Sequence, residues 1–346
     1  MKILVSGGAG FIGSNFVHHV LRNHASDQVV VVDKLTYAGH MGNLGAALKD
    51  ERLKFVRLDI CDPAVAEVAE GCDAVVHFAA ESHVDRSIED ASPFVRTNVE
   101  GTWRMVEACR KNGVGRFLHV STDEVYGSQN DGGKFTEASP LDPTSPYAAS
   151  KAASDLMVLC AVKTHRFPAV ITRCTNNYGP FQFPEKFIPL MISQALAGKP
   201  LPVYGDGKNV RDWIHVADHC RALDLVLRKG QEGQVYNIGG DCELENISVA
   251  RKILVTLGRP EMLLNFVTDR PAHDRRYALE CGKLKRELGW APAWNFEQGL
   301  AETINWYQAN GPWLSEILSG EYQKYFERHY VRRGETLAAA GKGGSR

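Results

Sequence analysis

A short apolar run, a cluster of glycines and a helical pattern follow one another at the start of the chain. The apolar run is Ile3–Val5, the glycine segment reads G-G-A-G-F-I-G, and the helical pattern extends from Phe11 to about Leu21. Glycines at this spacing allow a tight turn and let both the backbone and the N-terminus of the helix approach a pyrophosphate. The stretch therefore predicts a dinucleotide-binding turn made by Gly7, Gly10, Phe11, Ile12 and Gly13.

A second apolar run ends in an acidic residue at the distance that such a turn requires. Val29–Val32 is followed by Asp33, about twenty residues after the last glycine of the turn. A carboxylate at this position accepts hydrogen bonds from the adenosine ribose and repels a 2′-phosphate, so Asp33 favours NAD over NADP. The adjacent Lys34 weakens that preference slightly. A structural turn beside a surface aspartate is the alternative, and the strand–turn–helix context disfavours it.

Apolar runs and helical patterns alternate over the first half of the chain. Continuous apolar runs, which are typical of strands buried on both faces of a parallel sheet, occur at 53–58, 73–78, 116–121 and 168–173. Helical patterns occur between them at Pro63–Glu70 with Asp62 as N-cap, at Pro93–Lys111, and at Tyr147–His165 after Ser145 as cap and Pro146 in the first turn. The alternation predicts an α/β fold, a doubly wound parallel sheet of the Rossmann type with ligands at the carboxyl ends of its strands. Residues just after two of these strands are expected to contact the cofactor, namely Asp59, Ile60, Ala79 and Ala80.

The pattern changes after Cys174. Turn residues, aromatic residues and isolated cations intermingle there, which indicates a smaller, mostly C-terminal α/β lobe that binds a substrate. We predict a NAD-binding domain over 1–174 and about 212–240, a substrate-binding domain over about 175–211 and 241–330, and a disordered tail over 331–346. Further helices and one strand are predicted at Lys186–Ala197, Val216–Arg228, Val235–Ile238, Asn246–Leu257, Cys281–Leu288 and Phe296–Asn310.

The bulk composition argues against several classes of function. The 346 residues include 40 Lys and Arg against 41 Asp and Glu, a net charge of −1, so no nucleic-acid or anionic-membrane partner is indicated. We expect neither a signal peptide nor a membrane span, because the apolar runs are too short. Eight scattered cysteines without a C-x-x-C pair are typical of reduced thiols in a cytoplasmic protein.

A tyrosine and a lysine, Tyr147 and Lys151, stand one helical turn apart in Y-A-A-S-K. A free tyrosine titrates near 10, so a tyrosine that acts as a base near neutral pH needs its pKa lowered by roughly three units, about 4 kcal/mol. We expect the ammonium of Lys151 and a positively charged nicotinamide ring to lower it. The pattern often occurs by chance, but its position after a dinucleotide turn and a hydroxyl-ended strand favours hydride chemistry.

Two adjacent carboxylates, Asp123 and Glu124, precede that helix in V-S-T-D-E-V-Y-G. A simple alcohol dehydrogenase needs only a hydroxyl residue, a tyrosine and a lysine. Two further carboxylates in one pocket supply a general acid and a general base, and as close neighbours they tend to share one proton. Elimination of water needs such a pair, because one group protonates the leaving oxygen and the other removes a C–H proton. A solvated acidic turn is the alternative interpretation.

These motifs resemble the extended short-chain dehydrogenase/reductase family, and within it the dTDP-glucose 4,6-dehydratases, over about residues 1–330. The resemblance rests on G-G-A-G-F-I-G, D-K-L-T-Y-A-G, A-A-E-S-H-V-D-R-S-I, S-T-D-E-V-Y-G, Y-A-A-S-K, N-N-Y-G-P-F-Q-F-P-E-K, V-R-D-W-I-H-V-A-D-H and R-P-A-H-D-R-R-Y-A. The triplet T-D-E is the most specific, since related 4-epimerases have small or hydroxyl residues in place of the carboxylates. Related GDP-mannose dehydratases and nucleotide-sugar decarboxylases resemble T-S-E instead.

The resemblance implies a three-step dehydration of dTDP-glucose on bound NAD. Tyr147 would take the proton of the sugar 4-hydroxyl while hydride passes from C4 to NAD, and Thr122 would hydrogen-bond the 4-oxygen. The ketone acidifies the C5–H bond, so that Glu124 can remove that proton while Asp123 protonates the departing 6-hydroxyl. Hydride then returns to C6, C5 is reprotonated, and the product is dTDP-4-keto-6-deoxy-glucose.

The same resemblance implies which residues hold the two ligands. The implied catalytic residues are Thr122, Asp123, Glu124, Tyr147 and Lys151. Further cofactor contacts are implied at Lys34, Thr36, Ser82, Thr97, Cys174 and Asn176. Substrate contacts are implied at Ser82, Asn177, Lys186, Pro202, Tyr204, Arg211, Asn246, Arg270, His273 and Tyr277, where the cations would hold the diphosphate. For each of these substrate residues a surface ion pair or a structural turn is an equally good interpretation.

Alternatives to this function stay open. A dehydratase, 4-epimerase or decarboxylase that acts on a UDP- or GDP-sugar shares most of the motifs, and a non-catalytic NAD-binding sensor would share the fold. His215 and His219 have metal-ligand spacing but no third candidate ligand nearby, so we expect no metal. The helices at 93–111 and 147–165 carry more apolar surface than one sheet face needs, so we expect a homodimer that pairs them.

Overall fold

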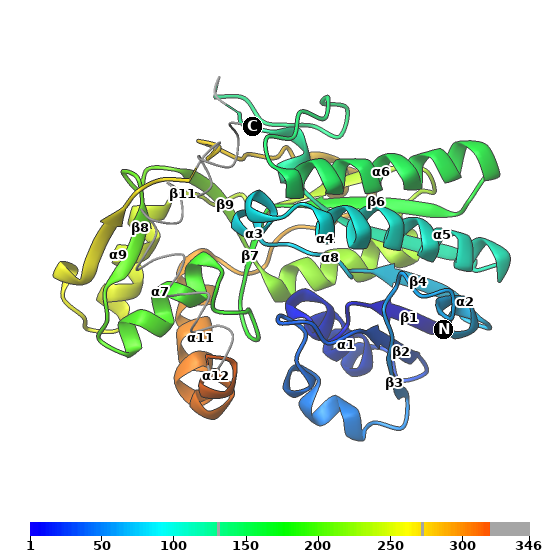
Figure 1. Cartoon of the computed structure of the whole chain (residues 1–346), viewed down its shortest axis with the longest axis horizontal. Coiled ribbons are helices and arrows are strands. Elements are labelled where there is room, and N and C mark those ends of the chain that lie inside the picture. The colour runs from blue at the N-terminus through cyan, green and yellow to red at the C-terminus, as the bar shows by residue number, and fades with distance from the viewer. Residues whose placement is uncertain (130–131, 271–272, 319–346) are drawn as a thin grey trace, which may run out of the picture.

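The computed structural model describes residues 1–129, 132–270 and 273–318. Within them, seven parallel strands form one sheet in the order β10-β6-β5-β4-β1-β2-β3 (Figure 1). The strands are β1 (Lys2–Ser6), β2 (Gln28–Asp33), β3 (Leu53–Arg57), β4 (Ala74–His77), β5 (Arg116–Thr122), β6 (Ala169–Cys174) and β10 (Val235–Ile238). The strand order reverses between β1 and β4, and such a switch point forms a crevice at the carboxyl ends of the strands. The predicted fold class is confirmed.

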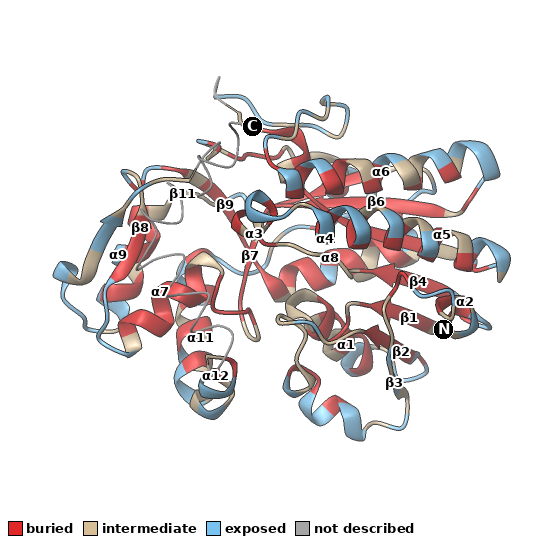
Figure 2. Cartoon of the chain, viewed as in Figure 1, coloured by how far each residue is buried: buried red, intermediate tan, exposed pale blue. Residues whose placement is uncertain are grey.

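Helices cover both faces of this sheet because its strands are apolar on both sides. In β2, Val29 and Val31 join one core and Val30 and Val32 join the other, as the alternation of a strand requires. Figure 2 shows the buried side of each helix turned toward the strands. One face is covered by α1 (Phe11–Asn23), α8 (Val216–Lys229) and α10 (Gly282–Leu288), and the other by α2 (Val65–Ala69), α5 (Thr102–Lys111) and α6 (Pro146–His165). Over the described ranges, none of the helices has the length and apolar character that crossing a membrane requires.

Two predicted helices differ from the observed ones. The predicted helix at Pro93–Lys111 is three consecutive segments, α4 (Ser92–Phe94), the π-helix η3 (Val95–Gly101) and α5. The wider π turns make room for Asn98, which is buried and hydrogen-bonds the backbone of Glu81 in both directions, at 2.8 and 3.0 Å. The predicted helix at Pro63–Glu70 starts two residues late, because Asp62 accepts a hydrogen bond from Ala64 and closes a separate turn.

Four short elements that were not predicted from the sequence follow strands of the large sheet. They are α3 (Val84–Glu89), η1 (Met41–Asn43), η2 (Gly45–Lys49) and η4 (Asp123–Tyr126). Each has six residues or fewer, which is too short for a periodic apolar pattern to stand out.

The second lobe packs beside the carboxyl ends of the large sheet around its own apolar core (Figure 1). A three-stranded sheet has the order β11 (Glu243–Glu245), β9 (Val210–His215) and β7 (Asn176–Tyr178), and β12 (Leu264–Val267) pairs with β8 (Leu201–Tyr204). The helices are α7 (Phe187–Leu196), α9 (Asn246–Thr256), η5 (Glu261–Leu263), α11 (Phe296–Ala309) and α12 (Gly311–Ile317). The predicted domain bounds stay a prediction, and the predicted tail at 331–346 lies outside the described residues.

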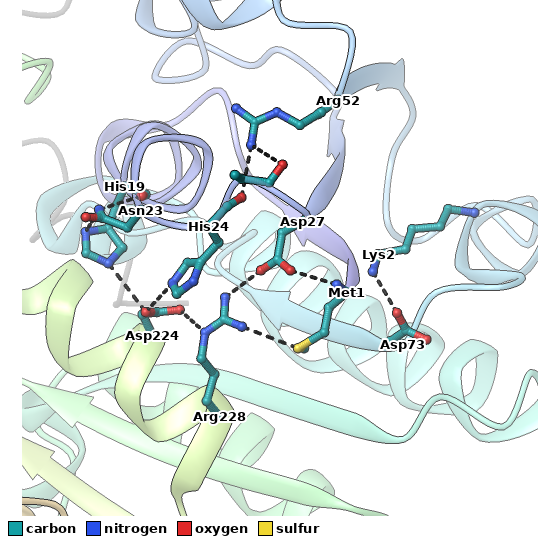
Figure 3. A network of polar contacts seen from close by, with 11 residues as sticks. Met1, Lys2, His19, Asn23, His24, Asp27, Arg52, Asp73, Asp224 and Arg228 are labelled. Atoms are coloured by element: carbon teal, nitrogen blue, oxygen red, sulfur yellow. Dashed lines mark hydrogen bonds and ion pairs between the residues drawn. The ribbon is translucent and has the colours of Figure 1, made fainter.

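An ion network closes the amino-end edge of the large sheet, opposite the site (Figure 3). Arg228 of α8 donates to Asp27 Oδ2 at 2.6 Å and to Asp224 Oδ1 at 2.7 Å. The terminal ammonium of Met1 pairs with the other oxygen of Asp27 at 2.7 Å. The network joins α8 to the starts of β1 and β2, so it stabilises the large sheet at the amino ends of these strands.

The same network contains three side chains at metal-ligand separation, which the sequence analysis missed. The ligand atoms of His19, His24 and Asp224 lie within 4.8 Å of one another. His24 Nε2 lies 2.8 Å from Asp224 Oδ2, and Arg228 occupies the other carboxylate oxygen. These polar groups satisfy one another as an ion network, and we assign no metal to them.

Candidate active site

A cavity of about 330 Å³ opens at the carboxyl ends of the central strands, where the fold class places ligands. Its walls come from the glycine turn after β1, the ends of β2, β4, β5 and β6, and the first turns of α6. The predicted cofactor residues that line it are Gly7, Gly10, Phe11, Ile12, Gly13, Asp33, Lys34, Thr36, Ile60, Ala79, Ala80, Ser82, Thr97, Tyr147, Lys151, Cys174 and Asn176.

The glycine turn forms one wall of this cavity, and two of its glycines leave no room for a side chain. Gly7 has φ of +70°, and a Cβ there would lie 2.6 Å from the backbone nitrogen of Ala79. A Cβ on Gly13 would lie 2.3 Å from the carbonyl oxygen of Gly7. The start of α1 is thereby held against the turn, and the N–H groups of a first helical turn have no partner within the helix. The arrangement fits a pyrophosphate.

The residues at the end of β2 fit an adenosine ribose that carries no 2′-phosphate. The Asp33 carboxylate accepts hydrogen bonds from two backbone N–H groups at 2.8 and 3.0 Å, which fix it at the cavity. Lys34 Nζ lies 3.6 Å from Asp59 Oδ2 and 4.0 Å from Glu81 Oε1, so carboxylates already balance its charge. Asp59 is the one predicted cofactor residue that does not line the cavity. The pairing reduces the attraction that Lys34 would offer to a 2′-phosphate.

The carboxylate pair enters the same cavity from the turn η4, directly after β5. Thr122 Oγ1 accepts from the N–H of Glu124 at 3.3 Å and donates to Asp123 Oδ1 at the same distance. Burial, and then the charge of Glu124, raises the pKa of Asp123 well above its ordinary value. Burial also raises the pKa of Glu124, but three nearby cations oppose it. Asp123 therefore keeps a proton more readily than Glu124 does. This difference suits Asp123 to act as an acid and Glu124 to act as a base.

Tyr147 and Lys151 enter from the first turns of α6, whose start agrees with the prediction. Ser145 Oγ accepts from the N–H of Ala148 at 3.1 Å and caps the helix. Lys151 Nζ donates to the carbonyl of Val120 at 2.9 Å, and burial lowers the pKa of Lys151 to about 8. The expected lowering of the Tyr147 pKa depends in part on a positively charged nicotinamide ring, so it stays a prediction. In the chain by itself, burial raises that pKa well above its ordinary value, and the nearby carboxylate of Glu124 adds to the effect.

A second cavity of about 160 Å³ adjoins the first, and Glu124 and Lys186 line both. Ser82, Thr122, Asp123 and Asn177 line the first cavity. The other predicted substrate residues line the second, namely Pro202, Tyr204, Arg211, Asn246, Arg270, His273 and Tyr277. The fold thus brings together residues from segments far apart in the sequence.

Three cations face this second cavity in different settings. The Arg211 guanidinium lies 4.3 Å from the centre of the Tyr277 ring. Lys186 Nζ donates to the carbonyl of Ser82 at 2.6 Å, and burial lowers the pKa of this lysine. Arg270 Nη1 lies 3.8 Å from the carboxylate of Asp85. Partly buried cations around a small cavity fit an anionic ligand such as a diphosphate.

His215 and His219, the two histidines with metal-ligand spacing, take part in contacts within the fold. His219 Nδ1 is hydrogen-bonded to Asn177 Oδ1 at 2.8 Å. His215 accepts from the N–H of Ala217 at 3.4 Å, which caps α8, and its other nitrogen lies 3.3 Å from Glu302.

Several residues that line the cavities were not predicted from the sequence. Glu185, Phe187 and Trp213 line both cavities, and His83 and Asp85 line the second. Four of these five lie inside motifs that carried the family resemblance, so the motifs were the available signal. Phe187 lies just outside one of them, and nothing in its local pattern separates a cavity-lining aromatic residue from a core one.

Comparisons with known proteins agree with this geometry. The family described as GDP-mannose 4,6 dehydratase matches residues 4–303. The dTDP-glucose 4,6-dehydratase of Actinoplanes sp. is 52% identical over 319 residues, which cover 90% of this chain and 99% of that protein.

Two solved structures of the same enzyme type have the same fold. DesIV, a dTDP-glucose 4,6-dehydratase from Streptomyces venezuelae with NAD and dTDP bound, superimposes with a TM-score of 0.90 and 51% identity, over 92% of this chain and 100% of that one. The Bacillus anthracis enzyme in complex with NAD gives a TM-score of 0.86 and 46% identity, over 92% and 99%.

These matches lead to one assignment. The family model covers residues 4–303, and the relatives match over nearly their whole lengths. They confirm the resemblance read from the motifs, whose T-D-E triplet and Y-A-A-S-K helix line one cavity. This chain belongs to the nucleotide-sugar 4,6-dehydratase family and, within it, to the dTDP-glucose 4,6-dehydratases.

Proposed function

We propose that this chain converts dTDP-glucose to dTDP-4-keto-6-deoxy-glucose and uses NAD that is restored in each turnover. One observation carries the proposal: a buried carboxyl that favours its proton, Asp123, lies beside a more readily ionised one, Glu124, in the cavity that also holds Tyr147 and Lys151. Hydride chemistry alone needs only the hydroxyl residue, the tyrosine and the lysine, so the acid–base pair points to elimination of water.

The residues of the first cavity fit NAD. The helix start and the glycine turn would hold the pyrophosphate, Asp33 the adenosine ribose, and the small Ala79 and Ala80 leave room across the strand ends. When bound, NAD would supply a hydride acceptor for C4 and, later in the turnover, a hydride donor for C6.

Tyr147 and Thr122 would act on the sugar 4-hydroxyl. Tyr147 would accept the hydroxyl proton, and the Thr122 hydroxyl would hydrogen-bond the same oxygen. Because the pKa of Tyr147 is raised in the chain by itself, its role as a base depends on positive charge nearby. Lys151, one helical turn away and lining the same cavity, would provide positive charge beside Tyr147 together with the nicotinamide ring.

Asp123 and Glu124 would then eliminate water across C5 and C6. The C4 ketone acidifies the C5–H bond, Glu124 accepts the C5 proton, and the C5–H electron pair forms the C5–C6 double bond. Asp123 gives its proton to the departing 6-hydroxyl, which leaves as water. Glu124 returns its proton to C5 when C6 is reduced. Tyr147 then holds the proton of the 4-hydroxyl and Asp123 lacks its own, so one proton passes from Tyr147 to Asp123, directly or by exchange with solvent, before the next turnover.

The second cavity would hold the nucleotide diphosphate. Lys186, Arg211 and Arg270 supply the positive charge, and Tyr204 and Tyr277 supply aromatic surface. A thymine base in place of uracil is supported by the dTDP bound in the DesIV structure.

A direct experiment separates this function from its alternatives. The protein is incubated with NAD and either dTDP-glucose or UDP-glucose, and the nucleotide-sugar mass is followed. We expect the dTDP-sugar to lose one water with no net production of reduced nicotinamide. An unchanged mass with an altered sugar would indicate an epimerase, and no change with either substrate would indicate a non-catalytic NAD-binding protein.

We also propose a homodimer that pairs the face formed by the predicted helices at 93–111 and 147–165, which are α4, η3 and α5, and α6. Val95 on η3 and Leu156 on α6 are each 56% exposed, and Ile88 on the adjoining α3 is 38% exposed, so apolar side chains face outward from these neighbouring elements. Light scattering after size exclusion should give a dimer, and Leu156→Glu should give a monomer. Val255→Glu is the matched control, because Val255 is 80% exposed on α9, away from this face. A monomeric unmodified protein would contradict the proposal.

A cytoplasmic location stays a prediction.

A further inference from the structure

A buried arginine behind the site touches both elements that carry the reacting groups. Arg173, near the end of β6, donates from Nε to Asp155 Oδ2 at 2.8 Å and from Nη1 to Tyr126 Oη at 2.8 Å. Its guanidinium carbon also lies 4.8 Å from the centre of the Tyr126 ring. Arg173, Asp155 and Tyr126 are at most 3% exposed, and none of them lines either cavity.

The two partners of Arg173 lie on the two elements that carry the reacting groups, η4 and α6. Asp155 lies on α6 one helical turn after Lys151, and α6 runs alongside β6 (Figure 1). Tyr126 is the last residue of η4, two positions after Glu124. The guanidinium therefore joins the helix of the tyrosine and lysine to the turn of the two carboxylates.

Other contacts fix each end of this bridge. Tyr126 donates from its hydroxyl to Asn237 Oδ1 at 2.9 Å, which anchors the turn to β10. Asp155 Oδ1 lies 3.3 Å from His119 Nε2 on β5. Burial alone would raise the pKa of Asp155, but its contact with His119 and the charge of Arg173 hold it below its ordinary value. The carboxylate of Asp155 thus stays charged and keeps its ion pair with Arg173.

We propose that Arg173 is a positioning residue which, through Tyr126 and Asp155, sets the place of the Asp123–Glu124 turn relative to the Tyr147–Lys151 helix. Oxidation at C4 and elimination across C5 and C6 must act on one bound sugar, so the two groups need a fixed separation. A planar guanidinium can donate in two directions at once, whereas a lysine ammonium has no such fork. The inference rests on the proposed function.

The test is a double-mutant cycle on the enzyme loaded with NAD. Tyr126→Phe removes only the hydroxyl, and Arg173→Lys keeps the positive charge beside Asp155 but loses the fork. Two rates are measured with dTDP-glucose: the near-ultraviolet signal of reduced nicotinamide in rapid mixing reports C4 oxidation, and loss of water by mass reports elimination. We expect each variant to lower the ratio of elimination to oxidation by roughly tenfold, since a misplacement of about 1 Å can cost about a hundredfold in rate.

The double variant tells a shared bridge from two separate effects. Because both substitutions break the same contact, the double variant should lower the ratio no more than the stronger single one. Tyr236→Phe is the matched control. Tyr236 is also fully buried and donates to Glu287 at 2.8 Å. It precedes Asn237 on β10, and neighbouring strand residues point to opposite faces of a sheet, so its variant should leave the ratio unchanged.

Several outcomes would overturn the inference. They are an unchanged ratio in Tyr126→Phe, an equal loss of both rates, and losses that multiply in the double variant. If the unmodified protein fails to dehydrate dTDP-glucose, the proposed function itself is wrong. If the unmodified protein dehydrates it and the ratio does not respond, only the role of Arg173 is wrong.

Discussion

Replacement of Asp123 by asparagine tests the division of labour between the two carboxylates. Asparagine keeps the shape of the side chain, and Thr122 can still donate to its oxygen in place of Asp123 Oδ1. The amide cannot give a proton to the departing 6-hydroxyl. A positioned general acid contributes about 10² to 10⁴ in rate, which corresponds to about 3 to 5 kcal/mol of barrier for elimination alone.

The other steps should survive the substitution. Tyr147 and Lys151 still serve C4 oxidation, so reduced nicotinamide should accumulate after mixing with dTDP-glucose, while water loss slows at least a hundredfold. Glu124 remains able to take the C5 proton, so in heavy water deuterium should enter C5 of the recovered sugar without loss of water. Rapid-mixing absorbance and mass spectrometry measure these quantities.

A stability measurement separates this effect from unfolding. Burial raises the pKa of Asp123, so this carboxyl costs stability as the pH rises above the pKa of the unfolded chain. Asp123→Asn should therefore unfold at the same temperature or higher at neutral pH. Asp212→Asn is the matched control for the unfolding temperature alone, because Asp212 is also buried with a pKa raised to about 6 and lines neither cavity, although its charge adds to the raised pKa of Asp123. Equal loss of oxidation and elimination in Asp123→Asn would refute the assignment of Asp123 as the acid.

Three further predictions follow from single contacts. Because burial lowers the pKa of Lys151 to about 8, kcat should fall as the pH rises past about 8, and Lys151→Arg should move that fall to higher pH; an unmoved profile would contradict the role of this charge. Gly13→Ala places a Cβ 2.3 Å from the Gly7 carbonyl oxygen, so calorimetric titration should show NAD affinity reduced at least about tenfold, and an unchanged affinity would mean that the turn can relax. Asp155→Asn leaves Arg173 buried without its counter-charge and should lower the free energy of unfolding by about 3–5 kcal/mol in denaturant titrations at neutral pH. Since the folded pKa of Asp155 is lowered, its stabilisation is present above the unfolded pKa and lost as the pH falls, so the unmodified and variant proteins should converge in acid.

Features that depend on neighbours in the chain were predictable from sequence. The glycine turn, Asp33 and the start of α6 at Ser145 each follow from a local requirement for a small residue, a carboxylate or a cap. The alternation of apolar strands and helices predicted the parallel sheet, because a strand that is buried on both sides shows a continuous apolar run. The T-D-E triplet likewise identified the reaction class, since the acid and the base are adjacent residues.

Features that depend on distant segments were decided only by the tertiary structure. The π turns at η3 follow from the fit of Asn98 against the backbone of Glu81, and no local pattern announces such a fit. Asp59 pairs with Lys34 beside the cavity instead of lining it, which strand-end position alone does not reveal.

The sequence by itself determined which groups gather at the site, and the tertiary structure decided their protonation. Asp123 and Glu124 are neighbours of similar chemistry, so their positions in the chain do not by themselves rank them as acid and base, and that ranking came from the family resemblance. Burial acts on both, and the cations that favour ionised Glu124 come from Lys186, Arg211 and Arg270, far along the chain. Desolvation and Coulomb interactions depend on distance in space, and only the folded chain sets those distances.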